Sequence, residues 1–298
     1  MAVLPVHAAA VTQSPLAEQP TASQKYVECR QSSIAPSTET RPVPQVLRAV
    51  REELKAGADF LKVMAGGGVA SETDAIESVQ FLAEEIQAIT RTVKQMSGGK
   101  KMVTAHAYTV EGIRHAIDNG VTGIEHGNLL DEPTARLMAD KGAFLTPTLS
   151  CYGIMTRAPF ENFLSDDGKV KNAQVMRKGL EALVLAEKCG VTVCYGTDLL
   201  SSMSALQTEE FYVRSTVLPA QTILRQATVN PARMLRMEGK LGVIAPGAFA
   251  DMIVLAKNPL VRPTSPAKPR SPVADLLARF GRTTSACSTG PRTTCSPS

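Results

Sequence analysis

Four residues that lie far apart in the chain could do chemistry together: Lys62, His106, His126 and Asp198. Each stands in or at the end of a short apolar stretch that we expect to be a β-strand. The carboxyl ends of parallel strands meet at one edge of a sheet, where α/β proteins build their sites. Two imidazoles and a carboxylate are the ligand set of a hydrolytic Zn²⁺ site. One histidine alone would indicate a core residue, but the set of four predicts a metal centre.

Lys62 is unusual because it stands in the middle of an apolar strand. The period of two in a strand places Phe60, Lys62 and Met64 on one face and Leu61 and Val63 on the other. A free ammonium buried there would cost several kcal/mol, so something must neutralise it or use it. The alternative is a lysine that reaches solvent at the open end of the strand, or one that pairs with a carboxylate.

The same period predicts which residues share a face with the other three candidates. They are Met102 and Thr104 with His106, Ile124 with His126, and Cys194 and Gly196 with Asp198.

The elements that would position these residues follow a repeated order of helix, glycine and strand. Gly57, Gly120, Gly142 and Gly190 each stand just before an apolar stretch. Glycine in the left-handed conformation after a helix turns the chain back into a sheet. Strands that alternate with helices imply a parallel sheet. The strand that ends at His106 brings the count to five βα units, too few for a closed eight-stranded barrel.

Two helices and one loop are predicted most clearly around the lysine strand. The loop Gly66-Gly67-Gly68 follows the strand and lacks both the GxGxxG spacing and a Walker lysine, so we expect backbone passing close to a site rather than a phosphate cradle. Helical spacing predicts a helix before the strand, ended by Gly57, and an amphipathic helix after it. Their apolar residues are Val46, Leu47, Val50 and Leu54, and then Leu82, Ile86, Ile89, Val93 and Met96.

Composition excludes several classes of protein. The 298 residues suffice for one large domain, alone or with a small satellite, and no apolar run is long enough to span a membrane. The net charge of +4 is small and spread out, which argues against nucleic-acid binding. The N-terminus lacks the basic region of a secretion signal. The six cysteines form no CxxC pair, so we expect a reducing cytoplasm.

The sequence resembles the amidohydrolase superfamily of metal-dependent hydrolases, in the branch related to prolidases, imidazolonepropionase and fungal ochratoxinase. The order Lys, His, His, Asp on successive strands is specific to that superfamily, and the resemblance covers about residues 45 to 260. The stretches that carry it are Gly57–Ser71, Val103–Tyr108, Gly123–Asn128, Phe144–Thr148, Tyr195–Asp198, Ala227–Arg233 and Gly239–Leu255.

The resemblance implies a role for each candidate residue. Lys62 would be carboxylated by CO₂ and bridge two divalent metal ions, expected to be zinc, which turns a costly buried cation into an anionic ligand. His106 and His126 would bind the second metal. Asp198 would ligate the first metal and act as the general base that moves a proton from water to the leaving amine. Tyr108 would face the substrate, or else simply pack at the mouth of the strand.

The sequence also departs from the family. The His-x-His pair that family members carry on the first strand is absent, and His7 and His115 are expected to be solvated residues outside the site. The resemblance therefore implies an α/β fold, a partial TIM-like (β/α) barrel that lacks its first strands, with a remnant of a small β-sandwich domain. We expect an irregular segment at 1–44, the barrel portion at 45–238, the β remnant at 239–260 and a low-complexity tail at 261–298.

Three hypotheses on function remain open. The first is a hydrolase of amide or peptide C–N bonds, acting on N-acyl amino acids or dipeptide-like substrates. The second is a truncated, impaired relative that binds one metal through Lys62, His106 and His126. The third is a scaffold whose open sheet edge binds a partner protein. Expected partners are a small amide or peptide substrate and further copies of the chain, with neither nucleic acid nor membrane.

Overall fold

The computed structural model describes residues 2–5, 27–28, 43–255 and 258–260 of the chain. The chain divides into two compact units. The sheet unit comprises Leu16–Pro147 and Met155–Thr192, and the helical unit comprises Met1–Pro15, Thr148–Ile154 and Val193–Ser298.

The sheet unit is built on parallel strands with helices between them. The strands in register are β3 (Leu61–Met64), β4 (Val103–Ala107), β5 (Gly123–His126) and β6 (Phe144–Thr146). The short strands β2 (Val27–Glu28) and β7 (Thr192–Val193) complete the sheet order β2-β3-β4-β5-β6-β7. This arrangement confirms the expected α/β fold of a partial TIM-like barrel.

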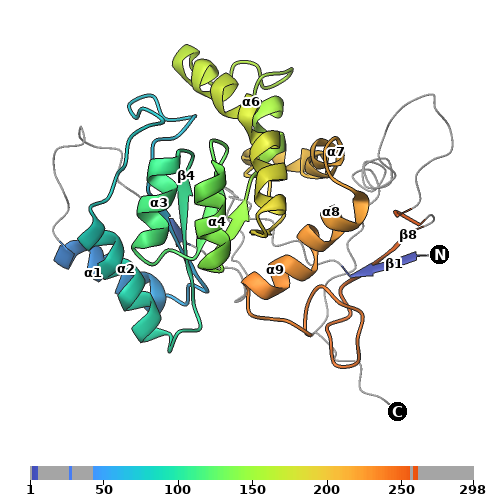
Figure 1. The fold of residues 1–298 in the computed structure, drawn as a ribbon, viewed down its shortest axis with the longest axis horizontal. Helices are drawn as coiled ribbons and strands as arrows, with labels where there is room; N and C mark the ends of the chain where they lie inside the picture. The colour runs from blue at the N-terminus through green and yellow to red at the C-terminus, as the bar shows by residue number, and fades with distance from the viewer. Residues whose placement is uncertain (1, 6–26, 29–42, 256–257, 261–298) are drawn as a thin grey trace. The chain divides into compact units, whose positions relative to one another are not determined.

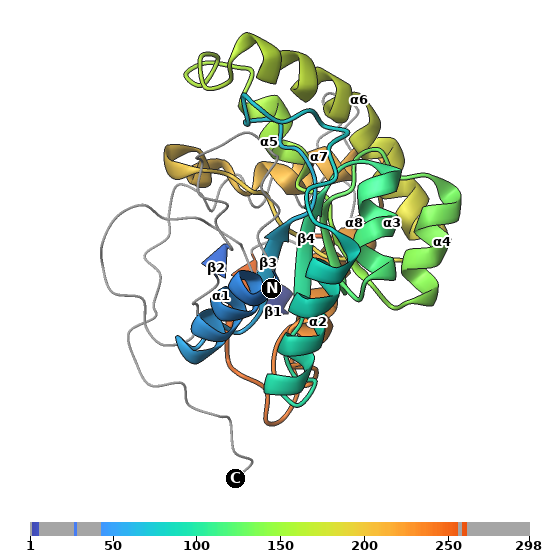
Figure 2. The same cartoon turned by 90° about the vertical axis from the view of Figure 1, so that its left-hand side faces the viewer.

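The helices of the sheet unit cover the strands with amphipathic faces. They are α1 (Val43–Lys55), α2 (Ala83–Met96), α3 (Val110–Asp118), α4 (Glu132–Asp140) and α6 (Asp166–Lys188). Figures 1 and 2 show α1 beside α2, and Figure 1 shows α3 beside α4. Thr109, Asp131 and Ser165 cap α3, α4 and α6 by accepting a backbone N–H with the side chain. Both predicted apolar stripes are buried at their centres, but Leu82 and Met96 at the ends of the second are exposed.

The helical unit contains short helices and one strand pair. The helices are α5 (Leu149–Ile154), the 3₁₀ helix η1 (Ser201–Leu206), α7 (Glu209–Ser215), α8 (Ala220–Ala227) and α9 (Val229–Met234). The strand β8 (Met252–Leu255) pairs antiparallel with β1 (Ala2–Pro5). No helix of the described residues is long and apolar enough to cross a membrane.

The helices and strands of the structure fall as follows within the expected domain boundaries. Helix α1 begins at Val43, within one or two residues of the expected start of order. The segment 1–44, expected to be irregular, contributes the strands β1 and β2. The expected β remnant at 239–260 contains β8, whose sheet partner comes from the opposite end of the chain. The expected tail at 261–298 and His7 lie outside the described residues.

Candidate metal centre

Lys62 lies inside the sheet unit, as its place in an apolar strand predicts. Only 7% of its surface is exposed, and the neighbouring residue in register is Thr104 on β4. The Thr104 hydroxyl is buried and makes no hydrogen bond to a described residue. The charge of the Lys62 ammonium acts on both His106 and His126, so the three side chains are electrostatic neighbours. The structure thus brings together the lysine and the two histidines predicted from the sequence.

His106 sits near the end of β4 and is 5% exposed. Its Nε2 atom lies 3.0 Å from the carbonyl oxygen of Gly67. Because a carbonyl can only accept a hydrogen bond, Nε2 must carry the proton. In the neutral ring the lone pair is then on Nδ1, which is the atom left to bind a metal.

His126 lies beside His106 because its backbone departs from a regular strand. It ends β5, where its register neighbour is Ala107, so a regular strand would direct it away from the face of His106. Its φ of 77° places it in the left-handed region instead. The ring centroids of His106 and His126 lie 4.5 Å apart at an interplanar angle of 74°. The expectation that His126 shares the face of Ile124 is therefore wrong, because that expectation assumed a regular strand.

Tyr108 packs against both imidazoles. Its ring centroid lies 4.9 Å from each of them, stacked on His126 at 24° and edge-on to His106 at 87°. The tyrosine is 4% exposed. This position fixes the orientation of the two rings, whereas a contact with substrate stays a prediction.

Both imidazoles are held in the neutral form that binds metals. The pKa of His106 is lowered to about 4, chiefly by burial and also by the charge of Lys62, against the opposing effects of the Gly67 carbonyl and Asp74. Burial, followed by the charges of His106 and Lys62, lowers the pKa of His126 well below its usual range. A ligand histidine must be deprotonated, so this environment prepares both rings for a cation.

The glycine loop passes close to this site, as expected. The loop returns on itself through a bridge between Gly66 and Val79, and the Gly67 N–H donates to Ser78 over 3.2 Å. A Cβ on Gly67 would lie 1.8 Å from the carbonyl oxygen of Ala75, so only glycine fits there. The tight loop is what presents the Gly67 carbonyl to His106.

Asp198 lies in the helical unit, and its convergence with Lys62, His106 and His126 stays a prediction. Strand β7 ends at Val193, so the expectation that Cys194, Gly196 and Asp198 share a strand face is wrong. Asp198 has a φ of 50°, which a non-glycine residue rarely adopts outside functional or tightly constrained sites. Burial raises the pKa of the Cys151 thiol well above its usual range, and the negative charges of Asp198 and Glu210 raise it further.

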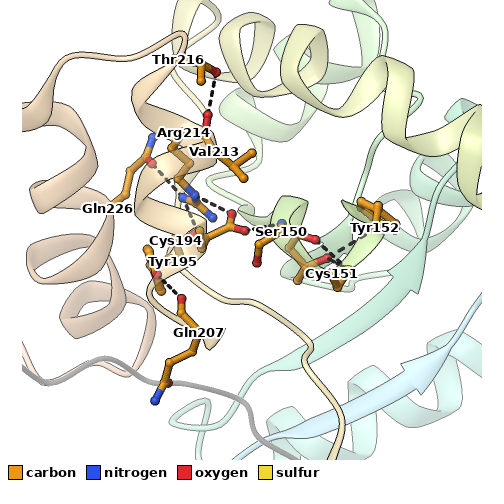
Figure 3. Close-up of polar contacts among 12 residues, drawn as sticks. Ser150, Cys151, Tyr152, Cys194, Tyr195, Gln207, Val213, Arg214, Thr216 and Gln226 are labelled. Atoms are coloured by element: carbon orange, nitrogen blue, oxygen red, sulfur yellow. Dashed lines mark hydrogen bonds and ion pairs between the residues drawn. The ribbon is translucent and has the colours of Figure 1, made fainter. Parts of the chain in front are cut away.

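A buried ion pair supports the segment that leads to Asp198, and sequence reasoning missed it. Arg214 and Glu210 are fully buried, with Arg214 Nε 2.7 Å from Glu210 Oε1. Arg214 Nη1 donates to the Cys194 carbonyl at 3.1 Å and to Gln226 Oε1 at 2.8 Å. Figure 3 shows Arg214 between Gln226 and the stretch that includes Ser150, whose backbone N–H donates to Glu210 Oε2 over 2.6 Å. The spacing of four in α7 was the only signal, and it is shared by exposed pairs.

Two further expectations concern residues outside the site. His115 was expected to be a surface residue, but it is half-buried and its Nε2 lies 2.8 Å from the Phe81 carbonyl oxygen. Among the described residues, Cys151, Cys189 and Cys194 form no disulfide.

The donors of the sheet unit fit one metal ion only if Lys62 takes part. No three His, Cys, Asp or Glu side chains of the described residues gather closely enough to hold a metal. The site offers two neutral imidazoles in contact and a buried lysine beside them. An ammonium repels a cation, but a carboxylated lysine would add an oxygen ligand of the type that divalent metals accept.

The chain is similar in sequence to a known family of proteins. The sequence model of the amidohydrolase family matches residues 10–283. An ochratoxinase from Aspergillus niger is 33% identical over 227 residues, which is 73% of this chain and 45% of that protein. The chain therefore spans about half the length of the curated relatives it matches.

Solved structures give the same result. A prolidase complexed with N-methylphosphonate-L-proline is 43% identical and superposes with a TM-score of 0.71, covering 74% of this chain and 53% of that one. An Xaa-Pro dipeptidase with methionine bound in its active site is 31% identical with a TM-score of 0.67, covering 74% and 54%.

Proposed function

The chain belongs to the amidohydrolase family, and from this premise we propose that it cleaves an amide or peptide C–N bond with a metal-activated water. The observation that carries the proposal is the pair of buried, neutral imidazoles of His106 and His126, in ring contact beside the buried Lys62. Buried groups with perturbed pKa values in one cluster are typical of functional sites.

Each residue has a proposed role. The neutral amine of Lys62 would add CO₂ to form a carbamate and release one proton, which gives an anionic oxygen ligand. His106, through Nδ1, and His126 would supply the imidazole ligands. A divalent metal, proposed to be zinc, would lower the pKa of bound water and polarise the scissile carbonyl. Asp198 would take the proton from the attacking water and give it to the leaving amine, and Tyr108 would border the substrate.

The proposed substrates are N-acyl amino acids and dipeptide-like amides. The support is that the similar solved structures include a prolidase and an Xaa-Pro dipeptidase, at 43% and 31% identity. The ochratoxinase, at 33% identity, is a further similar protein that supports this proposal.

A second candidate is a protein that binds one metal without turnover. It is favoured by the donor set of the sheet unit, where two histidines and one lysine gather but no third His, Cys, Asp or Glu does so among the described residues.

The test measures metal content, carbamate and hydrolysis on the same protein. Purified chain is loaded with Zn²⁺ in ¹³C-bicarbonate, and zinc is counted by mass spectrometry while a carbamate carbon is sought by ¹³C NMR. Release of amino acid is then measured over a panel of X-Pro dipeptides and N-acyl amino acids. Lys62→Ala is compared with Lys94→Ala, which alters an exposed lysine on α2.

Each outcome decides between the two functions. Zinc, a carbamate signal and hydrolysis that are all lost in Lys62→Ala support the hydrolase. Zinc and carbamate without hydrolysis support the metal-binding relative. Absence of zinc uptake by the wild-type chain rejects both.

A further inference from the structure

Lys171 on α6 holds the loop that follows β3, which carries Gly67 and lies beside His106, by hydrogen bonds to the loop backbone. The ammonium of this lysine donates to the carbonyl oxygens of Ser71, at 2.9 Å, and Asp74, at 2.7 Å. Its third donor meets Asp167 Oδ2 at 2.6 Å. An ammonium has three donors, so all of them are satisfied by this one arrangement. Lys171 is only 9% exposed, so it is a buried cation with specific hydrogen-bond partners and not a solvated helix residue.

The N-terminal turn of α6 and the loop are shaped for close contact. A Cβ on Gly168 would lie 3.0 Å from the carbonyl oxygen of Val69, so the helix approaches the loop where it carries glycine. Within the loop, the Ser71 hydroxyl donates to Asp74 Oδ2 at 2.9 Å. The stretch from Val69 to Asp74 is therefore held both by its own side chains and by α6.

The fastened loop acts on His106 in two ways. It presents the Gly67 carbonyl that fixes the proton on Nε2, and it places the carboxylate of Asp74 near enough to act on the charge of His106. The path from Lys171 to the site thus runs through the loop backbone.

We propose that Lys171 is a positioning residue, which holds the Ser71–Asp74 segment in place so that the Gly67 carbonyl keeps His106 in the tautomer that binds metal through Nδ1. This inference rests on the proposed function only for the role of His106 as a ligand. The loop position and the tautomer can be measured on the metal-free protein.

The test uses Lys171→Met, which keeps the length of the side chain and removes all three donors. Hydrogen exchange of the Gly67 and Gln80 amides should become about tenfold faster or more, because charged hydrogen bonds to the loop are lost. The ¹⁵N chemical shifts of His106 should change from those of an Nε2–H ring to those of a tautomer mixture. Zinc affinity should fall about tenfold or more, as expected when the partner that orients a ligand is disturbed.

Matched variants separate positioning from general damage. Lys169→Met lies on the same helix and removes an exposed ion pair with Asp166, so it should change none of these quantities. Lys171→Arg keeps a donor cation and should restore part of the loop protection. Gly168→Ala leaves Lys171 in place and introduces a good helix former, but the new Cβ crowds the Val69 carbonyl. We therefore expect faster hydrogen exchange in the same loop, and this variant serves if Lys171→Met fails to fold.

The inference and the proposed function fail separately. If the folded variants keep the wild-type exchange rates of the loop and the Nε2–H tautomer of His106, Lys171 is not a positioning residue, whatever happens to activity. If the wild-type chain takes up no zinc, the proposed function fails, while loop exchange and the tautomer still decide the role of Lys171.

Discussion

His126 is the sheet neighbour of Ala107, and yet its ring packs against that of His106 at a centroid distance of 4.5 Å. The left-handed backbone of His126, with a φ of 77°, turns the side chain across the end of the strand. Such a conformation costs on the order of 1–3 kcal/mol and persists only where the surroundings fix it. The imidazole pair therefore depends on the turn at the end of β5 as much as on the strands.

The first prediction tests the turn at the end of β5 by substitution of Gly127. Gly127 has a φ of 63°, and a Cβ there would lie 2.7 Å from Leu145 Cδ1. Gly142 has a φ of 64° with nothing within 4 Å, so it is a matched control. We expect Gly142→Ala to lower the free energy of unfolding by about 1 kcal/mol, and Gly127→Ala by about 1–3 kcal/mol more. Urea unfolding measures the free energy of unfolding of both variants. Equal losses of stability would mean that the Leu145 side chain can move aside without cost.

The glycine loop gives a second comparison. A Cβ on Gly67 would lie 1.8 Å from the Ala75 carbonyl oxygen, whereas the nearest atom to a Cβ on Gly68 is 3.8 Å away. We expect Gly67→Ala to lower the free energy of unfolding by about 3 kcal/mol or more and to abolish the single His106 tautomer, since the backbone must move. Gly68→Ala should keep both. A Gly67→Ala protein with unchanged stability and tautomer would contradict the loop geometry.

The stability of the metal-free protein should depend on pH through the imidazoles. The unfolded chain takes up a proton at His106 near pH 6.5, but the folded site does so only near pH 4. The free energy of unfolding should therefore fall as pH drops from 6.5 to 4, by on the order of 3 kcal/mol for this residue. Lys62 opposes protonation of the ring and Asp74 favours it. The lowered pKa of His126 acts in the same direction.

Urea unfolding at a series of pH values measures this decline. His106→Gln should make it shallower, because one of the two buried rings is gone. A slope that is the same in the wild-type protein and in His106→Gln would mean that His106 is not buried in neutral form.

The buried pair in α7 should matter more than an exposed pair with the same spacing. Arg214→Met leaves the Glu210 carboxylate buried without its cation and removes the donors to Cys194 and Gln226, so we expect a loss of about 3–5 kcal/mol in the free energy of unfolding. Arg136→Met breaks the exposed pair with Glu132 and should leave stability nearly unchanged. Similar losses in the two variants would contradict the difference in burial.

Much of the fold is written in local patterns. The helix before β3, the glycine that follows it and the buried centre of α2 were predictable, because apolar spacing and a left-handed glycine act over a few residues. That Lys62, His106 and His126 lie near one another at one edge of the sheet was also predictable, since each stands on its own parallel strand, but the direction of the His126 side chain was not. The predicted approach of the glycine loop to the site was confirmed at Gly67.

Other features have no local signal. Lys171 follows Asp167, and Arg214 follows Glu210, at the spacing of four found in exposed helix pairs, and only the burial of the two cations distinguishes these pairs. That burial is set by residues such as Ser71 and Gln226, which are distant in the sequence.

The sequence by itself determined the family, the alternation of strands and helices, and the residue types that could bind a metal. The tertiary structure decided that His126 turns out of its strand to meet His106, that the Gly67 carbonyl selects the tautomer of His106, and that Lys171 holds the loop. Residue types and periods act locally along the chain, whereas a left-handed turn or a satisfied buried cation exists only when distant segments pack around it.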